Sequence, residues 1–161
     1  MAAVDYFMKI DGIKGESGDS KHKDEVDVLS WSWGETQQGA HATGGGGGAG
    51  KVVMQDFSFT KRVDKASAPL LLACASGQHI KSVEMVCRKA GKDQQEYLKV
   101  TMSDVLISSY QVGGSQGEVV PIDQVSMNFS KIEMEYKAQK ADGTLDAPTK
   151  AGWDLKSNVK V

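Results

Sequence analysis

"QVSMNFSKIEMEYKAQ", residues 124–139, is the stretch that best shows what kind of fold this chain forms. Its apolar residues alternate and change phase once, as Val125, Met127 and Phe129, then Ile132, Met134 and Tyr136. Alternation of this kind predicts a β-strand with one buried face. A one-residue change of phase is what a β-bulge produces, so we expect a long strand with a bulge near Ser130–Lys131.

The same alternation recurs along most of the chain. Short apolar and β-branched runs separated by polar or glycine-containing stretches predict further strands over residues 4–10, 26–33, 52–61, 82–89, 96–102 and 105–112. Residues 67–77 break the pattern. Ser67 is a candidate N-cap, Leu70, Leu71 and Cys74 have helical spacing, and Gly77 is a stop signal, so we predict one short helix packed on the sheet.

Length and composition limit the possible classes of protein. The chain has 161 residues, which indicates one domain over residues 1–161, and many short strands with one helix suggest a closed or nearly closed barrel or sandwich. A net charge of −2 gives no indication of a nucleic-acid partner or of binding to an anionic membrane. No apolar run could insert into a membrane, and the first residues do not resemble a secretory signal peptide. We expect Cys74 and Cys87 to be reduced, buried thiols.

The glycine run "GGGGGAGKVV", residues 44–53, matches the spacing of a phosphate-binding loop around Gly45 and Lys51. That motif also needs a buried strand before it, a Ser or Thr after the lysine, and a helix to receive the phosphates. Here Val52 follows Lys51 and a β pattern follows Val52. We therefore expect a flexible loop rather than a nucleotide site.

Other catalytic patterns are equally incomplete. "GGSQG", residues 113–117, has the spacing of a hydrolase nucleophile elbow around Ser115, but a helical pattern does not follow it and every histidine precedes it. The histidines are isolated and the two cysteines lie far apart, so no metal site is predicted. We expect neither a cofactor nor a catalytic residue, and hence not an enzyme.

The 26–33 segment is apolar on both faces. Trp31 and Trp33 lie on one face, and valines lie on the other. An antiparallel strand with one solvated face would alternate cleanly. The two tryptophans are therefore candidates either for the core or for a contact between subunits.

Together these stretches resemble the Hcp family, the haemolysin-coregulated proteins that form the inner tube of the bacterial type VI secretion system. The matching pieces cover essentially the whole chain: "KGES" (14–17), "DVLSWSWG" (27–34), "GGGGGAGK" (44–51), "QDFSFTK" (55–61), "CASGQH" (74–79), "RKAG" (88–91), "EYL" (96–98), "NFSKIEMEY" (128–136), "QKADG" (139–143) and "GWDLKSN" (152–158). Each piece is weak alone, but their order and spacing are specific. "VGGSQGE", residues 112–118, is the least distinctive region.

The resemblance implies a mainly β fold: a compact two-sheet β-barrel with one short helix on its side. It implies a homohexameric ring, stacked rings that form a hollow tube, a VgrG-type spike, contractile sheath proteins, and secreted effectors carried in the lumen. It also implies assembly in the cytoplasm followed by export through the type VI system. The alternative is a small β-barrel ligand-binding protein or a hydrolase.

Two sets of site residues follow from this resemblance. The loop after the tryptophan strand would contact the next ring, which assigns ring stacking to Gly39, His41, Gly44, Gly45, Gly46, Gly47, Gly48, Gly50 and Lys51. Alternation sends Ser30 and Ser32 to the face opposite Trp31 and Trp33. If the tryptophans pack inward, the two serines face the lumen and any effector in it.

Overall fold

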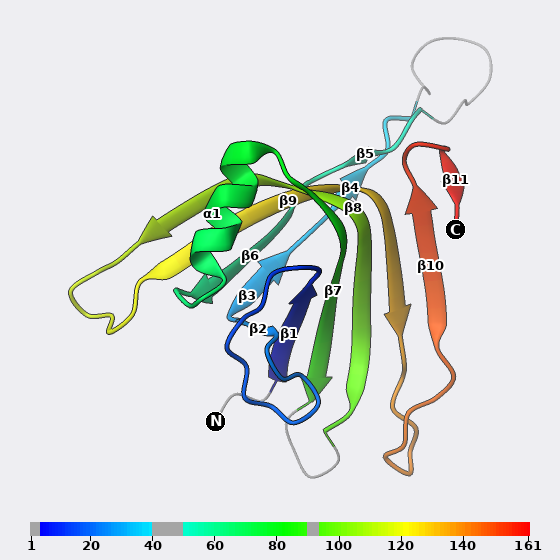
Figure 1. The fold of residues 1–161 in the computed structure, drawn as a ribbon. Helices are drawn as coiled ribbons and strands as arrows, with labels where there is room; N and C mark the ends of the chain where they lie inside the picture. The colour runs from blue at the N-terminus through cyan, green and yellow to red at the C-terminus, as the bar shows by residue number, and fades with distance from the viewer. Residues whose placement is uncertain (1–3, 40–49, 90–93) are drawn as a thin grey trace.

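The computed structural model describes residues 4–39, 50–89 and 94–161. Figure 1 shows a strongly curled sheet with one helix at its side. The elements in chain order are β1 (Val4–Ile10), β2 (Val26–Val28), β3 (Ser30–Ser32), β4 (Glu35–Thr36), β5 (Val53–Met54), β6 (Phe57–Arg62), α1 (Ser67–Ser76), β7 (His79–Lys89), β8 (Glu96–Gly113), β9 (Ile122–Tyr136), β10 (Thr149–Asp154) and β11 (Val159–Lys160). The mainly β class predicted from the sequence is confirmed.

All pairings are antiparallel, and β8 and β9 are the long strands that hold the sheet together. The main sheet has nine strands, with β11, β10, β9, β8, β7, β1 and β2 in order and with β6 between β9 and β3. A separate two-stranded sheet joins β4 and β5. β2 pairs with β1 and β3 pairs with β6, and only Leu29 separates β2 from β3. The sheet is therefore curled but not closed, so of the expected forms a fully closed barrel is excluded and a nearly closed one remains.

The phase change in β9 is confirmed, but the predicted bulge is not. Phe129 and Ile132 are both buried, three residues apart. The pairing with β8 nevertheless keeps one register from Ile107 to Leu98. The partner strand makes the same change of face at Asp104, whose φ of 54° is left-handed. Register shifts occur instead between Ile107 and Ser109 and, in β7, between Cys87 and Arg88.

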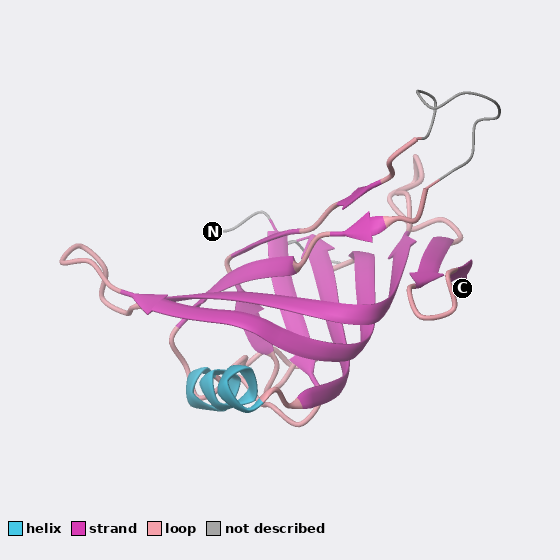
Figure 2. Ribbon diagram, turned by 90° about the horizontal axis from the view of Figure 1, so that it is seen from above, coloured by secondary structure: helices cyan, strands magenta, loops and turns pink. Residues whose placement is uncertain are grey.

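This shared change of face makes a corner in both long strands (Figure 2). Before the corner β9 pairs with β6, and after it β9 pairs with β10. The sheet thus has a β3–β6–β9–β8 part and a β1–β7–β8–β9–β10 part. Apolar side chains from both parts form one core, which includes Met8, Phe57, Phe59, Val83, Met85, Val100, Met102, Val105, Val125 and Met127.

Helix α1 packs on this core with Leu70 and Ala73, which are fully buried. Gly77 ends the helix as predicted, in a left-handed conformation with φ of 67°. The predicted N-cap is wrong, since Ser67 is the first helical residue and the side chain of Ala66 at the cap forms no hydrogen bond. Leu71 is 53% exposed, so it does not belong to the buried face of the helix.

A buried ionic cluster ties α1 to the sheet. Lys61 Nζ lies 2.7 Å from Asp123 Oδ2 and 2.7 Å from Asp64 Oδ1, and Lys61 and Asp123 are fully buried. Ser67 Oγ donates to Asp123 (2.6 Å), and Tyr110 Oη donates to its other oxygen (2.7 Å). Burial alone would raise the pKa of Asp123, but hydrogen bonds from Lys61, Ser67 and Tyr110 hold it below its ordinary value.

The 11–25 segment covers part of the outer face of β1 and β7. His22 stacks on Phe7 with ring centroids 4.2 Å apart, and its nitrogens contact Glu25 (2.9 Å) and Glu96 (2.6 Å). The Arg88 guanidinium lies 4.7 Å from the Phe7 ring centre. Both cysteines are free, as expected. Cys87 is buried, whereas Cys74 is only half-buried; burial raises the pKa of Cys87 to about 11.

Candidate functional site

The outer face of the β3–β6–β9–β8 part carries small or amide side chains without charge. Alternation along each strand sends apolar residues to the core and polar residues outward. The strand registers align these polar residues in two rows across the sheet, Ser30–Thr60–Gln124–Gln111 and Ser32–Ser58–Ser126–Ser109. We call this surface the neutral face.

Hydrogen bonds within the rows hold several of these side chains. Ser30 Oγ lies 2.6 Å from Thr60 Oγ1, and Ser58 Oγ lies 3.0 Å from Ser126 Oγ. These contacts satisfy part of the hydrogen-bonding capacity of the hydroxyls, and the remaining donors and acceptors face outward. The neutral face can therefore form hydrogen bonds with a partner without attracting or repelling its charges.

A charged residue lies at each end of β6 on this side of the sheet. Arg62 is exposed and follows Thr60 by two residues, and Asp56 is exposed and precedes Ser58 by two. Ser108 donates a hydrogen bond of 2.5 Å to Asp56. The two neutral rows thus lie between a cation and an anion on the same strand.

The predicted lumen residues Ser30 and Ser32 are both exposed on the neutral face. Trp31 points the other way and stacks on Phe57, with ring centroids 5.7 Å apart and nearly parallel planes. Tyr6 meets the Trp31 ring edge-on at 6.3 Å. Alternation therefore placed this segment correctly, but it could not show that three more strands extend the same polar surface.

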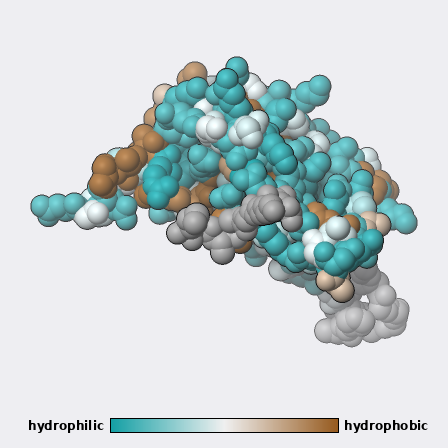
Figure 3. All heavy atoms as spheres, turned by 90° about the horizontal axis from the view of Figure 1, so that it is seen from below, coloured by the Kyte–Doolittle hydropathy of each residue, from teal (hydrophilic) through white to brown (hydrophobic). Residues whose placement is uncertain are grey.

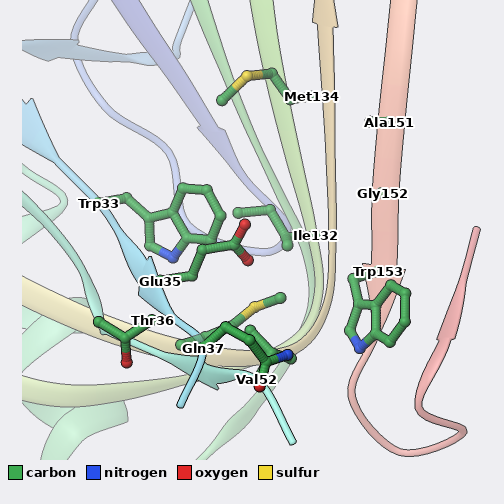
Figure 4. Close-up of a pocket in the computed structure, with 11 residues that line it drawn as sticks. Trp33, Glu35, Thr36, Gln37, Val52, Ile132, Met134, Ala151, Gly152 and Trp153 are labelled. Atoms are coloured by element: carbon green, nitrogen blue, oxygen red, sulfur yellow. The ribbon is translucent and has the colours of Figure 1, made fainter. Parts of the chain in front are cut away.

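Trp33, the second predicted core or interface residue, is half-buried and packs against Phe129 at 6.2 Å. It also lines an open apolar groove of about 690 Å³ between the β4–β5 pair and β10 (Figure 4). Sequence analysis missed this groove because it missed β4, β10 and β11. The only signal was the apolar character of Trp153 and Met134, which by themselves fit a core equally well.

Most of the predicted stacking loop lies outside the described residues, including His41 and Gly44 to Gly48. Gly39, Gly50 and Lys51 are described, and all three are exposed. The Gly50 N–H donates to Gln38 O at 3.2 Å, and a Cβ at Gly50 would lie 2.6 Å from that oxygen. Glycine is thus required there for close backbone approach. Strand β5, not a helix, follows Lys51, as expected for a loop that does not bind phosphate.

Among the residues that the structure describes, the candidate catalytic groups Ser115, Ser67 and Lys61 are either unassembled or enclosed. Ser115 lies in the turn between β8 and β9, and no helix follows it. Ser67 and Lys61 are 2.9 Å apart, an arrangement found in some hydrolases, but Lys61 is fully buried and Ser67 is 7% exposed. Within the described residues, no cluster of His, Cys, Asp and Glu could hold a metal ion, and no helix is long and apolar enough to span a membrane.

Comparison with known proteins shows which family this chain resembles. A family model described as "Type VI secretion system effector, Hcp" matches residues 7–136. The protein Hcp1 of Pseudomonas aeruginosa is 49% identical over 160 residues, which cover 98% of this chain and 99% of that protein.

Solved structures show the same fold. Hcp1 from Salmonella typhimurium has 37% identity and a TM-score of 0.82, covering 99% of this chain and 100% of that chain. A structure described as a type six secretion system protein has 29% identity and a TM-score of 0.92, with the same coverage. A type VI secretion system effector from Yersinia pestis has 35% identity and a TM-score of 0.75, covering 93% of this chain and 99% of that chain.

These similarities define a class: the chain is a tube or effector protein of a type VI secretion system. Within that class, it belongs to the Hcp family.

Proposed function

We propose that six copies of this chain form a ring and that the neutral face lines its central hole. Stacked rings would make a hollow tube that carries effector proteins, with a VgrG-type spike at its tip and contractile sheath proteins around it. The tube would assemble in the cytoplasm and then leave the cell through the same system. The observation that carries this proposal is the neutral face, with its paired rows of uncharged side chains.

The physical reason is that a conduit must hold different cargo proteins and then release them. A charged wall would bind oppositely charged cargo tightly and repel the rest. Hydroxyl and amide groups exchange hydrogen bonds with water at little net cost, since each protein–protein bond replaces bonds to solvent. Side chains as short as serine also leave the hole wide. Both properties favour a passage over a tight binding site.

Stacking of rings is assigned to the 39–51 loop. Its described ends support this role, because Gly50 already approaches the Gln38 backbone closely and the exposed Lys51 lies beside it. Replacing Gly44–Gly48 by a short Ser-Asn turn should leave rings but abolish tubes. Rings that still stack and are still exported would remove the loop from this role.

Electron microscopy of the purified protein tests the main proposal. We expect rings with a central hole, and labelling can identify what lines it. In a Cys74→Ser background, Ser32→Cys and Thr101→Cys would each be coupled to a polyethylene glycol maleimide. Thr101 is the matched control because it faces outward from the other part of the same sheet. Only the label at position 32 should fill the hole; a hole filled from position 101 would reverse the assignment of faces.

A further inference from the structure

The groove beside Trp33 is an apolar surface without a partner in the described part of the chain. Its volume is about 690 Å³, and Met134, on its wall, is 38% exposed. Figure 4 shows Trp33 on one side and Trp153, from β10, on the other. The apolar lining residues include Trp33, Val52, Met54, Ile132, Met134 and Trp153, and Glu35 is the charged residue among the rest.

Both indoles have an unused hydrogen-bond donor. The Nε1 atoms of Trp33 and Trp153 are shielded from solvent and have no hydrogen-bond partner among the described residues. An indole N–H can only donate, and leaving it buried and unbonded has a free-energy cost. These donors are closed off from solvent, so a segment that brought apolar side chains into the groove would cover its apolar wall rather than bond to the indoles.

The molecule carries a segment of this kind at its opposite end. The end of β8, the start of β9 and the 114–121 turn between them form a hairpin arm that projects away from the body (Figures 1 and 2). On this arm Val112 is 55% exposed and Val119 is 99% exposed. Figure 3 shows apolar surface gathered near the base of the arm on an otherwise largely hydrophilic face.

The arm also has an open backbone edge. Strand β7 pairs with β8 only as far as Leu106. From residue 107 to 113, β8 pairs with β9 on one side, and the pairings among the described residues include none on the other. Exposed valines and an unpaired strand edge both favour contact with another chain.

We infer that the hairpin arm of one copy inserts into the groove of the next copy, with Val119 packed between Trp33 and Trp153. The inference rests on the proposed ring, because it names the contact that closes it. Arm and groove lie at opposite ends of the molecule (Figure 1), so the contact is head-to-tail. A head-to-tail contact leaves a free arm and a free groove at the ends of every open chain, and only a closed ring satisfies them all.

Two substitutions test whether the arm drives assembly. Val119→Asp would place a carboxylate against the apolar groove, so the concentration for half-assembly should rise by about tenfold or more. Leu72→Asp, at a leucine of α1 that is 61% exposed and lies outside both arm and groove, is the matched control and should assemble like the unchanged protein. Sedimentation velocity measures both. Since Val119 is exposed, the thermal midpoint of dilute Val119→Asp protein should not change.

Cross-linking tests the contact itself. In a Cys74→Ser background, the pair Val119→Cys and Ala151→Cys should form disulfides between copies under mild oxidation, giving a ladder that ends at the closed ring. Either single variant should give no ladder. Rings that form normally without this cross-link would overturn the arm-in-groove contact and leave the proposed function standing. A protein that stays monomeric at every concentration would overturn both.

Discussion

Strands β8 and β9 run through both parts of the sheet, and their outer faces differ sharply on the two sides of the corner. Before the corner in β9, the outer residues Gln124 and Ser126 belong to the neutral face. After it, the outer residues are Glu133 and Glu135, and Lys99 of β8 stands opposite Glu135. We call this second surface the charged face. Its signs alternate between strands, since Lys9 lies opposite Glu84 and Lys150 lies 3.8 Å from Glu135.

The difference between the two surfaces means that the need for solubility does not by itself explain why the neutral face lacks charge. The charged face has the mixed charges expected of a sheet surface in water. The neutral face belongs to the same strands, yet Lys61 and Asp123 beneath it point inward and pair with each other, and its exposed charges, Asp56 and Arg62, lie only at its ends. Uncharged residues on one side and buried charges on the other are what the proposed lining of a passage would require, and folding alone does not require them.

The largest expected effect comes from breaking the charge pair beneath the neutral face. Lys61→Met leaves the carboxylate of Asp123 buried without its cation, and we expect a loss of about 3–5 kcal/mol in the free energy of unfolding. Replacing both partners, as Lys61→Met with Asp123→Leu, should recover part of this loss because the fully buried carboxylate is gone, although Asp64 still loses its cation. Urea unfolding measures all three proteins. A loss below about 1 kcal/mol for Lys61→Met would mean that the pair does little to hold β6, β9 and α1 together.

A smaller effect is expected from acid, through an ion pair at the edge of the charged face. Hydrogen bonds from Arg88 lower the pKa of Asp19 from 3.8 to about 2. Because the folded protein holds this carboxylate ionised, its contribution to stability is present above about pH 4 and is lost as the pH falls toward 2. Asp19→Asn should therefore make stability less dependent on pH between 4 and 2, by about 1 kcal/mol for a partly exposed pair.

The control for this prediction is Asp11→Asn, which removes an exposed carboxylate outside the ion pairs found in the described residues. It should keep the slope of the unchanged protein over the same pH range. Thermal midpoints at several pH values are sufficient. Equal slopes for Asp19→Asn and the unchanged protein would show that the Asp19–Arg88 contact does not contribute to folding.

Local sequence patterns predicted where most strands lie but not how the strands pair or where one strand continues into the next. The alternation of Trp31 with Ser30 and Ser32 depends on neighbouring residues only, and it placed each side chain on the correct face. The single strand expected over 26–33 breaks at Leu29, because β2 and β3 pair with different partners. The strands expected over 96–102 and 105–112 are one strand, because the long partner β9 carries β8 through the corner at Asp104.

The candidate site was predictable to the same extent. Ser30 and Ser32 could be found, but the other members of their rows come from residues far apart in the sequence and meet only through registry. The groove needed β10, where "TKAGWD" (149–154) has too little alternation to indicate a strand. The buried Lys61 was only partly recognisable, because alternation puts it on the face of Phe57 and Phe59 but a lysine is expected to be exposed until its partner Asp123 is known.

The two substitutions with the smallest expected effect on stability test the difference between the neutral face and the charged face most directly. Ser126→Lys and Thr101→Lys place the same charge at outward positions on the neutral and the charged face. Each should change the free energy of unfolding by about 0.5 kcal/mol or less, as surface substitutions do. Thr101 has Glu84 and Glu133 opposite it on the adjacent strands, so a lysine there gains favourable neighbours. Ser126 has Ser58 and Ser109 opposite it, so a lysine there loses a hydroxyl contact and gains no anion.

The two variants should differ in ring assembly and export although their stabilities are similar. In a closed ring, Ser126→Lys would repeat its charge around the central hole, where like charges repel each other and hold basic cargo away. We expect fewer rings or less co-purified effector for Ser126→Lys, and unchanged values for Thr101→Lys. Sedimentation velocity gives the ring fraction, and the amount of protein in the culture medium gives export. If both variants assemble and are exported like the unchanged protein, the absence of charge on the neutral face has no role in transport. If Thr101→Lys is the variant that fails, the charged face is the one that meets the hole.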